Sequence, residues 1–337
     1  MRVALDAMGG DAAPKECVQG ALRALSERPQ LQVALVGLED KIREELDGES
    51  YDAERLEIVP ATQVVAANER PADALRKKRD SSIVRSFTLV REGGADAVVS
   101  AGNTGAVVGA ATVLWKLIPG VRRAGIAVAL GTQSHHTVLI DVGANIYCKP
   151  QHLVHYGLMA SVYAERVLGT ENPRVALLNI GSEEGKGNEL VKETQRLFAE
   201  APFNYVGHAE GNDVFSELAD VIVCEGFVGN VVLKVAEGLS ERMHRQFDAV
   251  MESATFGREN PESVEILREF RRRTDYAEIG GAALLGVNGT CLIAHGRSDR
   301  RAISNAVQLA HRFAEAQVVD VIKDGVENAR SALHREG

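Results

Sequence analysis

The chain has 337 residues, of which 45% are hydrophobic and 25% charged, a balance typical of a soluble globular protein with a sizeable core. Its formal net charge of −9 argues against general nucleic-acid binding. No apolar run is long enough to span a membrane, no signal-peptide pattern opens the chain, and the 4 cysteines form no C-x-x-C pair. We therefore expect a cytoplasmic protein with no disulfide framework and no metal site.

Short apolar runs alternate with amphipathic segments along the chain. The runs expected to form strands are 3–5, 32–36, 56–59, 96–100, 124–130, 137–140, 174–180, 220–224 and two within 284–295. The expected helices cover 15–27, 38–46, 82–91, 104–119, the residues after 150, after 188 and from 230 to about 251, and the C-terminal segment. This alternation predicts an α/β fold with a doubly wound, mostly parallel sheet and helices on both faces, in a single domain spanning 1–337.

Turns rich in Gly, Asn and Asp follow five of the expected strands, at 6–11, 102–105, 141–145, 181–188 and 225–230. Ligands of parallel sheets bind beyond the carboxyl ends of the strands, so we expect these turns to share one rim and form a crevice for an anion. The simpler alternative is that Gly and Asn are only forming turns.

The turn at 102–105 joins a buried strand to a helix that begins with small residues. Gly102 and Gly105 allow the backbone to approach a ligand, Asn103 tolerates a left-handed turn, and Thr104 is the expected N-cap. Exposed N–H groups at such a helix start favour phosphate or carboxylate.

The turns also carry a family resemblance. In order along the chain, the matching stretches are 5–11, 79–82, 99–105, 141–145, 179–181, 186–190, 226–230 and 280–286. Together they resemble the bacterial phosphate acyltransferases of phospholipid synthesis, and they cover almost the whole chain. The resemblance implies transfer of a fatty acyl group from acyl carrier protein to inorganic phosphate, giving acyl phosphate for a glycerol-3-phosphate acyltransferase. It also implies a homodimer without a cofactor, and a fold similar to phosphate acetyltransferases and isopropylmalate dehydrogenases.

The sequence departs from the family pattern at three places. Tyr147 stands where an acidic residue is expected, and Glu225 stands where aspartate is expected. The segment 253–274 is more charged than the apolar hairpin by which the family is thought to touch membranes. A membrane- or partner-facing helical region near 240–278, giving weak peripheral contact with the inner face of the membrane, therefore stays an open expectation.

The implied chemistry needs few catalytic groups. Phosphate is already largely deprotonated near neutral pH, and a leaving thiolate with a pKa of about 8.5 needs no strong acid. The site must hold phosphate near the thioester carbonyl, stabilise an oxyanion and exclude water. The absence of an evident Ser-His-Asp or Cys-His set in the sequence agrees with that requirement.

With the resemblance, three residues are candidates for catalysis. Lys186 is the expected cation for phosphate or the oxyanion, Asn230 could give its amide N–H to the oxyanion or cap a helix, and Asp6 could orient donors or take a proton. The expected substrate contacts are Asp11, Arg79, Ser81, Ser82, Gly102, Asn103, Thr104, Gly105, Asn145 and Gly229.

Two other chemistries are left open. Cys148 and Cys224 lie near strand ends and could form an acyl-thioester, although buried structural cysteines are common. His152 and His155 lie three apart on an expected helix, but without a third ligand an ordinary helix surface is favoured over a metal site.

Two basic runs could dock an acidic carrier protein on this acidic enzyme. They are Arg76, Lys77, Lys78 and Arg79 in one run, and Arg271, Arg272 and Arg273 in the other. Such runs are usually only solvated.

Three rival functions remain. An oxidoreductase of the isopropylmalate type is disfavoured because no G-x-G-x-x-G follows the first strand. A phosphate acetyltransferase using acyl-CoA and a non-catalytic phosphate-binding scaffold for lipid enzymes are the other two.

Overall fold

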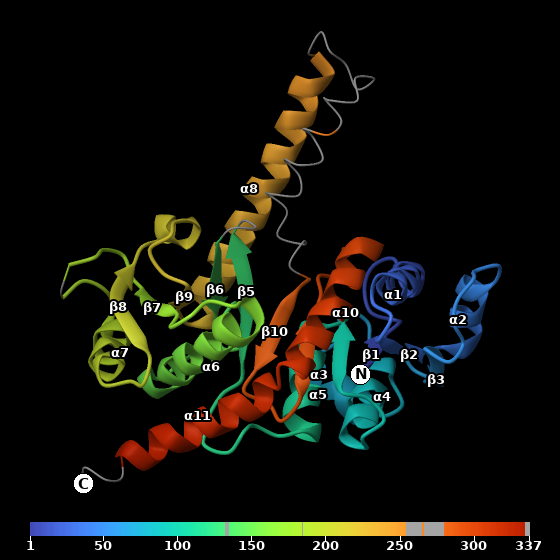
Figure 1. The fold of residues 1–337 in the computed structure, drawn as a ribbon, viewed down its shortest axis with the longest axis horizontal. Helices are drawn as coiled ribbons and strands as arrows, with labels where there is room; N and C mark the ends of the chain where they lie inside the picture. The colour runs from blue at the N-terminus through green and yellow to red at the C-terminus, as the bar shows by residue number, and fades with distance from the viewer. Residues whose placement is uncertain (132–134, 184, 254–264, 266–279, 334–337) are drawn as a thin grey trace.

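The computed structural model describes residues 1–131, 135–183, 185–253, 265 and 280–333. Within them lies one eleven-stranded sheet in the order β3-β2-β1-β4-β11-β10-β5-β6-β9-β7-β8. The strands are β1 (Arg2–Asp6), β2 (Gln32–Gly37), β3 (Leu56–Pro60), β4 (Ala97–Ser100), β5 (Gly125–Gly131), β6 (His136–Ile140), β7 (Arg174–Leu178), β8 (Asn204–Ala209), β9 (Val221–Val223), β10 (Ala282–Leu285) and β11 (Thr290–Ile293). The expected α/β sheet is confirmed (Figure 1).

Helices cover both faces of this sheet, as predicted. They are α1 (Lys15–Glu27), α2 (Glu39–Leu46), α3 (Pro71–Lys77), α4 (Ser82–Arg91), α5 (Thr104–Leu114), α6 (Pro150–Leu168), α7 (Glu189–Ala199), the 3-10 helix η1 (Gly211–Phe215), α8 (Gly226–Ser253), α10 (Arg300–Glu315) and α11 (Val318–Leu333). Elements not predicted from the sequence are α3, η1 and β8, and one C-terminal helix was expected where the structure has α10 and α11. In β8 only Ala209 is fully buried, so the strand lacks the apolar run that marks the others.

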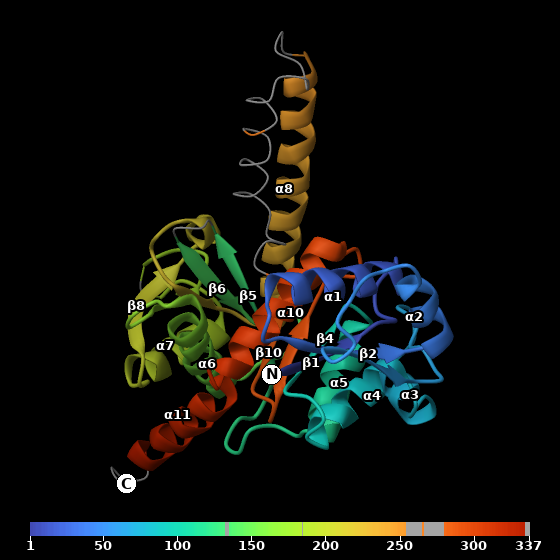
Figure 2. The same ribbon diagram turned by 45° about the vertical axis from the view of Figure 1, so that its right-hand side comes forward.

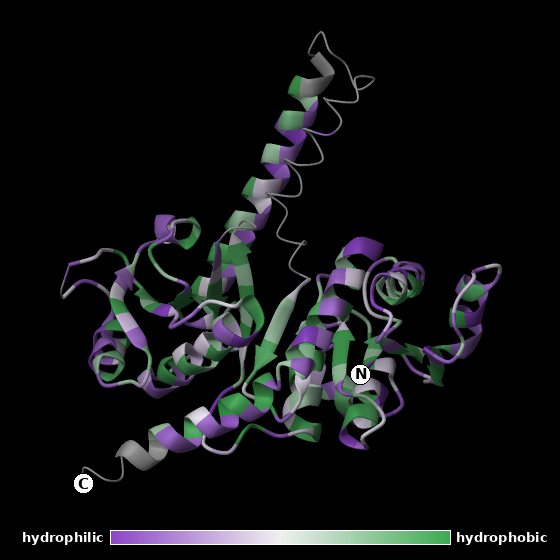
Figure 3. Ribbon diagram, viewed as in Figure 1, coloured by the Kyte–Doolittle hydropathy of each residue, from purple (hydrophilic) through white to green (hydrophobic). Residues whose placement is uncertain are grey.

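The two faces have separate apolar cores. One core packs α1, α6, α10 and α11 against the sheet, with Tyr156 and Tyr163 fully buried within it. The other packs α3, α4, α5 and the first part of α8 against the opposite face, around Phe87 and Trp115, whose ring centroids lie 4.5 Å apart. Hydropathy colouring shows the strands as the apolar centre between these layers (Figure 3).

The expectation that all five turns share one rim is wrong. Strand β10 is antiparallel to β11 and to β5, and β5 is antiparallel to β6, so β6, β9, β7 and β8 run against the direction of β1 and β4. The turns 6–11 and 102–105 therefore follow strands of one direction, and 141–145, 181–188 and 225–230 follow strands of the other. Three antiparallel pairings in the middle of the sheet cause the reversal.

Helix α8 extends away from the body of the protein beyond the edge of the sheet (Figures 1 and 2). Within the helical region expected near 240–278, α8 continues as far as Ser253. Residues 254–264 and 266–279 lie outside the described residues. No described helix is both long enough and apolar enough to cross a membrane.

Candidate active site

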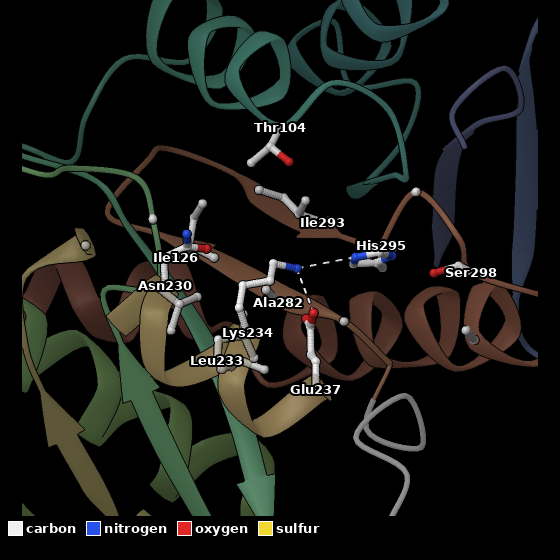
Figure 4. A pocket seen from close by; sticks show the side chains of 18 of the residues that line it. Thr104, Ile126, Asn230, Leu233, Lys234, Glu237, Ala282, Ile293, His295 and Ser298 are labelled. Carbon is white, nitrogen blue, oxygen red and sulfur yellow. Dashed lines mark hydrogen bonds and ion pairs between the residues drawn. The ribbon is translucent and has the colours of Figure 1, made fainter. Parts of the chain in front are cut away.

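A cavity of about 460 Å³ lies over the face of the sheet between α5 and α8. Its floor is apolar and comes from the middle strands, with Ile126 and Val128 on β5 and Ile293 on β11. Its polar groups are the side chains of Thr104, Asn230, Lys234, Glu237, His295 and Ser298 (Figure 4). Turns that follow strands of both directions therefore line this cavity. Thr104 comes from one set of turns, and Gly143, Gly226 and Asn230 come from the other.

Lys234, Glu237 and His295 form the charged cluster of the cavity. Lys234 Nζ donates to Glu237 Oε2 at 2.7 Å, and the Glu237 side chain is only 7% exposed. Lys234 Nζ also lies 3.4 Å from His295 Nε2 (Figure 4). Glu237 therefore fixes the position of the ammonium group that faces the cavity.

The ring nitrogens of His295 have different roles. Its Nδ1 accepts a hydrogen bond from the Arg297 backbone N–H at 3.1 Å. Burial, and then the nearby Lys234 charge, lower the pKa of His295, so the ring is neutral near pH 7. A neutral ring with Nδ1 accepting carries its proton on Nε2. In this tautomer Lys234 Nζ and His295 Nε2–H are two neighbouring donors 3.4 Å apart that do not hydrogen-bond to each other, an arrangement that suits an anionic oxygen accepting from both.

The start of α8 corrects one expectation about Asn230. The helix begins at Gly226, and Glu225 accepts from the backbone N–H groups of Phe227 at 2.6 Å and Val228 at 3.0 Å. Glu225 is thus the cap, and Asn230 lies one turn into the helix, where its N–H pairs within the helix. Its side chain, not its backbone amide, is what Asn230 offers to the cavity.

Asp141 shapes the turn that faces Asn230. Its carboxylate accepts from the backbone N–H groups of Ile126, Gly143, Ala144 and Asn145 at 2.7–3.1 Å. Burial raises the pKa of Asp141, and these bonds oppose the rise. Gly143, with φ of 135°, carries the turn past Asn230. The turn is a rigid wall of the cavity.

Asn145, expected to contact substrate, is occupied within the protein. Its side-chain amide donates to Ala124 O at 2.6 Å and to Tyr156 Oη at 2.9 Å. Gly229 lies against the end of β6, where an added Cβ would overlap the carbonyl oxygen of Asp141. Both residues support the site from behind.

Asp6 has the same supporting role at the end of β1. It is 1% exposed, accepts from Ser100 Oγ at 2.6 Å and from the Met8 N–H at 3.2 Å, and burial raises its pKa. Ser81 caps α4 through the Val84 N–H, and Ser82 is 1% exposed and hydrogen-bonds to Asp6. None of these three residues lines the cavity.

At the start of α5, Asn103 is the N-cap in place of Thr104. Its Oδ1 accepts from the Ala106 N–H at 3.0 Å, and its Nδ2 donates to three backbone carbonyls of 66–69. Thr104 is the first helical residue and lines the cavity. Gly102 and Gly105 pack instead against neighbouring atoms of Asp6 and Pro71.

Three other predicted residues lie around the site. The backbone N–H of Asp11 donates to Gly296 O at 2.8 Å, and Gly296 lines the cavity. Lys186 follows β7, forms an ion pair with Glu183 at 3.3 Å and is half-exposed; it does not line the cavity. Arg79 is exposed after α3.

The first basic run lies on and after α3, which packs on α5 through Leu75 near Gly109. Arg76 pairs with Asp73 at 3.4 Å, Lys78 donates to Glu69 and to Val64 O, and Lys77 is exposed. The second run, 271–273, lies outside the described residues.

The alternatives that rest on cysteine and histidine find no support in the described residues. Burial raises the pKa of the Cys224 and Cys148 thiols, and neither residue lines the cavity. His152 is buried and its Nδ1 accepts from the Lys149 N–H, so it caps α6 and does not lie on an open helix surface as expected. No group of three or more His, Cys, Asp or Glu able to hold a metal occurs among the described residues.

No sequence motif marks Lys234, Glu237 or His295. Lys234 and Glu237 lie three apart on a charged amphipathic helix, a spacing that usually means a surface ion pair. His295 lies just after β11, and only the folded chain brings it beside Lys234 of α8.

Solved structures of phosphotransacylases share this fold. The structure aligns with a phosphotransacetylase from Streptococcus pyogenes with a TM-score of 0.63 over 95% of this chain and 94% of that chain, at 17% identity. It also aligns with a branched-chain phosphotransacylase from Enterococcus faecalis V583 with a TM-score of 0.59 over 93% and 99% of the two chains, at 16% identity. These likenesses establish the fold class.

Sequence relatives are closer. A family model described as "Fatty acid synthesis protein" matches residues 1–321. The chain is 46% identical to the phosphate acyltransferase of Desulforamulus reducens over 97% of this chain and 98% of the relative. It is 47% identical to that of Heliobacterium modesticaldum over the same shares of the two chains. The chain belongs to this family, and it is an acyltransferase.

Proposed function

We propose that this enzyme transfers a fatty acyl group from acyl carrier protein to inorganic phosphate. The product, acyl phosphate, would supply a glycerol-3-phosphate acyltransferase in phosphatidic acid synthesis. The observation that carries the proposal is the pair of neighbouring donors, Lys234 Nζ and His295 Nε2–H, beside the apolar floor of the cavity. The relatives named phosphate acyltransferase support the choice of phosphate as acceptor.

In the proposed reaction, Lys234 and His295 hold one phosphate oxygen while another attacks the thioester carbonyl. The amide of Asn230 donates to the carbonyl oxygen as it becomes an oxyanion. The C–O bond to phosphate forms, the C–S bond breaks, and the leaving thiolate takes up, through water, the proton that hydrogen phosphate loses. The apolar floor of Ile126, Val128 and Ile293 excludes water from the acyl phosphate.

The direct test is incubation of the enzyme with phosphate and either palmitoyl-acyl carrier protein or palmitoyl-CoA, with acyl phosphate trapped as its hydroxamate and identified by mass spectrometry. We expect product from both thioesters, with kcat/KM at least tenfold higher for the carrier-protein donor. Equal values for the two donors would point to a CoA-dependent phosphate acyltransferase. If neither donor gives acyl phosphate, the remaining alternative is the non-catalytic phosphate-binding scaffold for lipid enzymes.

The carrier-protein donor needs a docking surface, and we propose the exposed part of the first basic run. Arg76 and Lys77 project from α3, one helix away from Thr104. Replacing both by Glu is expected to raise the KM for acyl carrier protein about tenfold at low salt and to leave kcat unchanged, because rim charges act on encounter. The same double change to Glu at the exposed Lys41 and Arg43 on α2 is the control. An unchanged KM would remove the run from carrier docking.

The homodimer, the cytoplasmic location and the weak contact with the inner membrane face stay proposals. Sedimentation equilibrium of the purified enzyme tests the first. Cosedimentation with anionic vesicles tests the last, and no lipid-dependent pelleting would remove it.

A further inference from the structure

A second cavity of about 370 Å³ adjoins the candidate active site. The two cavities share Leu233 and Glu237, which stand in the wall between them. The second cavity is lined by Leu130 of β5, Val214 and Phe215 of η1, and Ala236 and Met243 of α8. No step of the proposed reaction places a substrate group in the second cavity.

The two cavities follow one another along α8 and the sheet, on either side of Leu233 and Glu237. Along β5, Ile126 and Val128 line the first cavity and Leu130 lines the second, which is the alternation of one strand face. Along α8, the lining moves from Asn230 through Leu233 to Met243, about 20 Å at the rise of an α-helix. We call the two cavities together the α8 passage.

Carbon surface dominates the second cavity, with a minority of polar side chains that includes His135, Ser216 and Glu217. Leu130, Val214, Phe215 and Met243 supply carbon surface, and Phe215 is 60% exposed although aromatic side chains gain from burial. Several polar groups on its walls already have partners within the protein, although the buried Nε2 of His135 has none. The Thr137 hydroxyl donates to Ala219 O at 3.0 Å, and Glu237 binds Lys234.

We propose that the second cavity holds the distal methylenes of the acyl chain while the thioester lies beside Asn230, Lys234 and His295. This inference rests on the proposed function, because it takes the thioester to lie in the first cavity. The chain would pass over Leu233, and each methylene buried beyond it would add about fourfold to affinity. The length of the passage would then set a preference for long acyl chains over short ones.

Ala236→Phe tests the proposal, because Ala236 lines the second cavity and not the first, so the new ring takes up the space proposed for the distal methylenes. We expect its kcat/KM for a palmitoyl donor to fall at least tenfold, while its kcat/KM with an acetyl donor stays within twofold of wild type. Ala236→Ser, which changes polarity but fills no space, is the matched control and should keep both rates. Met243→Trp, at the far end, should shift the preference toward shorter chains.

A binding measurement separates this proposal from the proposed function. Palmitate titrated calorimetrically into the wild-type enzyme should bind, and Ala236→Phe should weaken that binding at least tenfold. If Ala236→Phe weakens palmitate binding but no donor gives acyl phosphate, the proposed function is wrong and the acyl-chain site stands. Acyl phosphate formation with an unchanged palmitoyl-to-acetyl ratio in both Ala236→Phe and Met243→Trp, and unchanged palmitate binding, would overturn the chain site.

Discussion

Lys234→Met is expected to lower kcat/KM for acyl phosphate formation by a factor of about 100 to 1000, the cost typical of losing one preorganised charged donor. Lys234 supplies a cation to the lining of the cavity, which it shares with Asn230 and His295. Glu237 Oε2 holds its Nζ in place at 2.7 Å. Without it, a phosphate dianion would have to enter an apolar cavity of an acidic protein against the surrounding field. Steady-state kinetics with varied phosphate measure the change.

The controls separate charge from folding. Lys234→Met leaves the Glu237 carboxylate, 7% exposed, without its cation, and a buried uncompensated charge destabilises a protein by itself. The double variant Lys234→Met with Glu237→Gln removes both charges, and we expect wild-type thermal stability with the same loss of rate. Lys41→Met, on exposed α2, is the distant control. A double variant as fast as wild type would remove Lys234 from the reaction.

Lys186→Met decides between the two lysines. From the sequence, Lys186 is the expected catalytic cation, because it lies in a Gly-rich turn of the family pattern. The structure pairs Lys186 with Glu183 outside the cavity wall. We expect a smaller loss than for Lys234→Met.

The strands of this fold were predictable because buried strands are short apolar runs, and residues 97–100 and 221–223 lie inside predicted runs. Strand direction was not predictable in the same way. An apolar run such as 282–285 looks the same whichever way it pairs, and β10 turned out antiparallel to both neighbours. That choice decides on which side each later turn emerges, and it explains why the single rim was wrong.

The site residues show a similar limit. Asp6, Asn103 and Asn145 were expected to contact the substrate or to orient groups that do. In the structure the side chain of each forms hydrogen bonds within the protein instead. The sequence locates such turns but does not say whether a side chain faces the cavity or the backbone behind it. Lys234 and His295 are 61 residues apart and meet only through the fold.

Gly229→Ala is the second large effect we expect, and it acts through backbone position. An added Cβ at Gly229 would overlap the carbonyl oxygen of Asp141 and lie 2.9 Å from Cys224 Sγ. Neither the backbone at the end of β6 nor a buried thiol can yield as a flexible side chain could, so the start of α8 must move. We expect a loss of about 1–3 kcal/mol in the free energy of unfolding, the usual cost of overpacking, measured by urea denaturation.

The same shift should reach the chemistry, because Asn230 and Lys234 lie on the first turns of the helix that moves. A displacement of about 1 Å in positioning groups costs on the order of 100-fold in rate, so Gly229→Ala should lose kcat well beyond its loss of stability. Gly238→Ala is the matched control on the same helix, where an added Cβ meets no atom within 4 Å. It should gain about 0.5–1 kcal/mol of helix stability and keep wild-type kcat. If Gly229→Ala kept wild-type kcat in its folded fraction, the packing of α8 on the end of β6 would not be what positions Asn230 and Lys234 for catalysis.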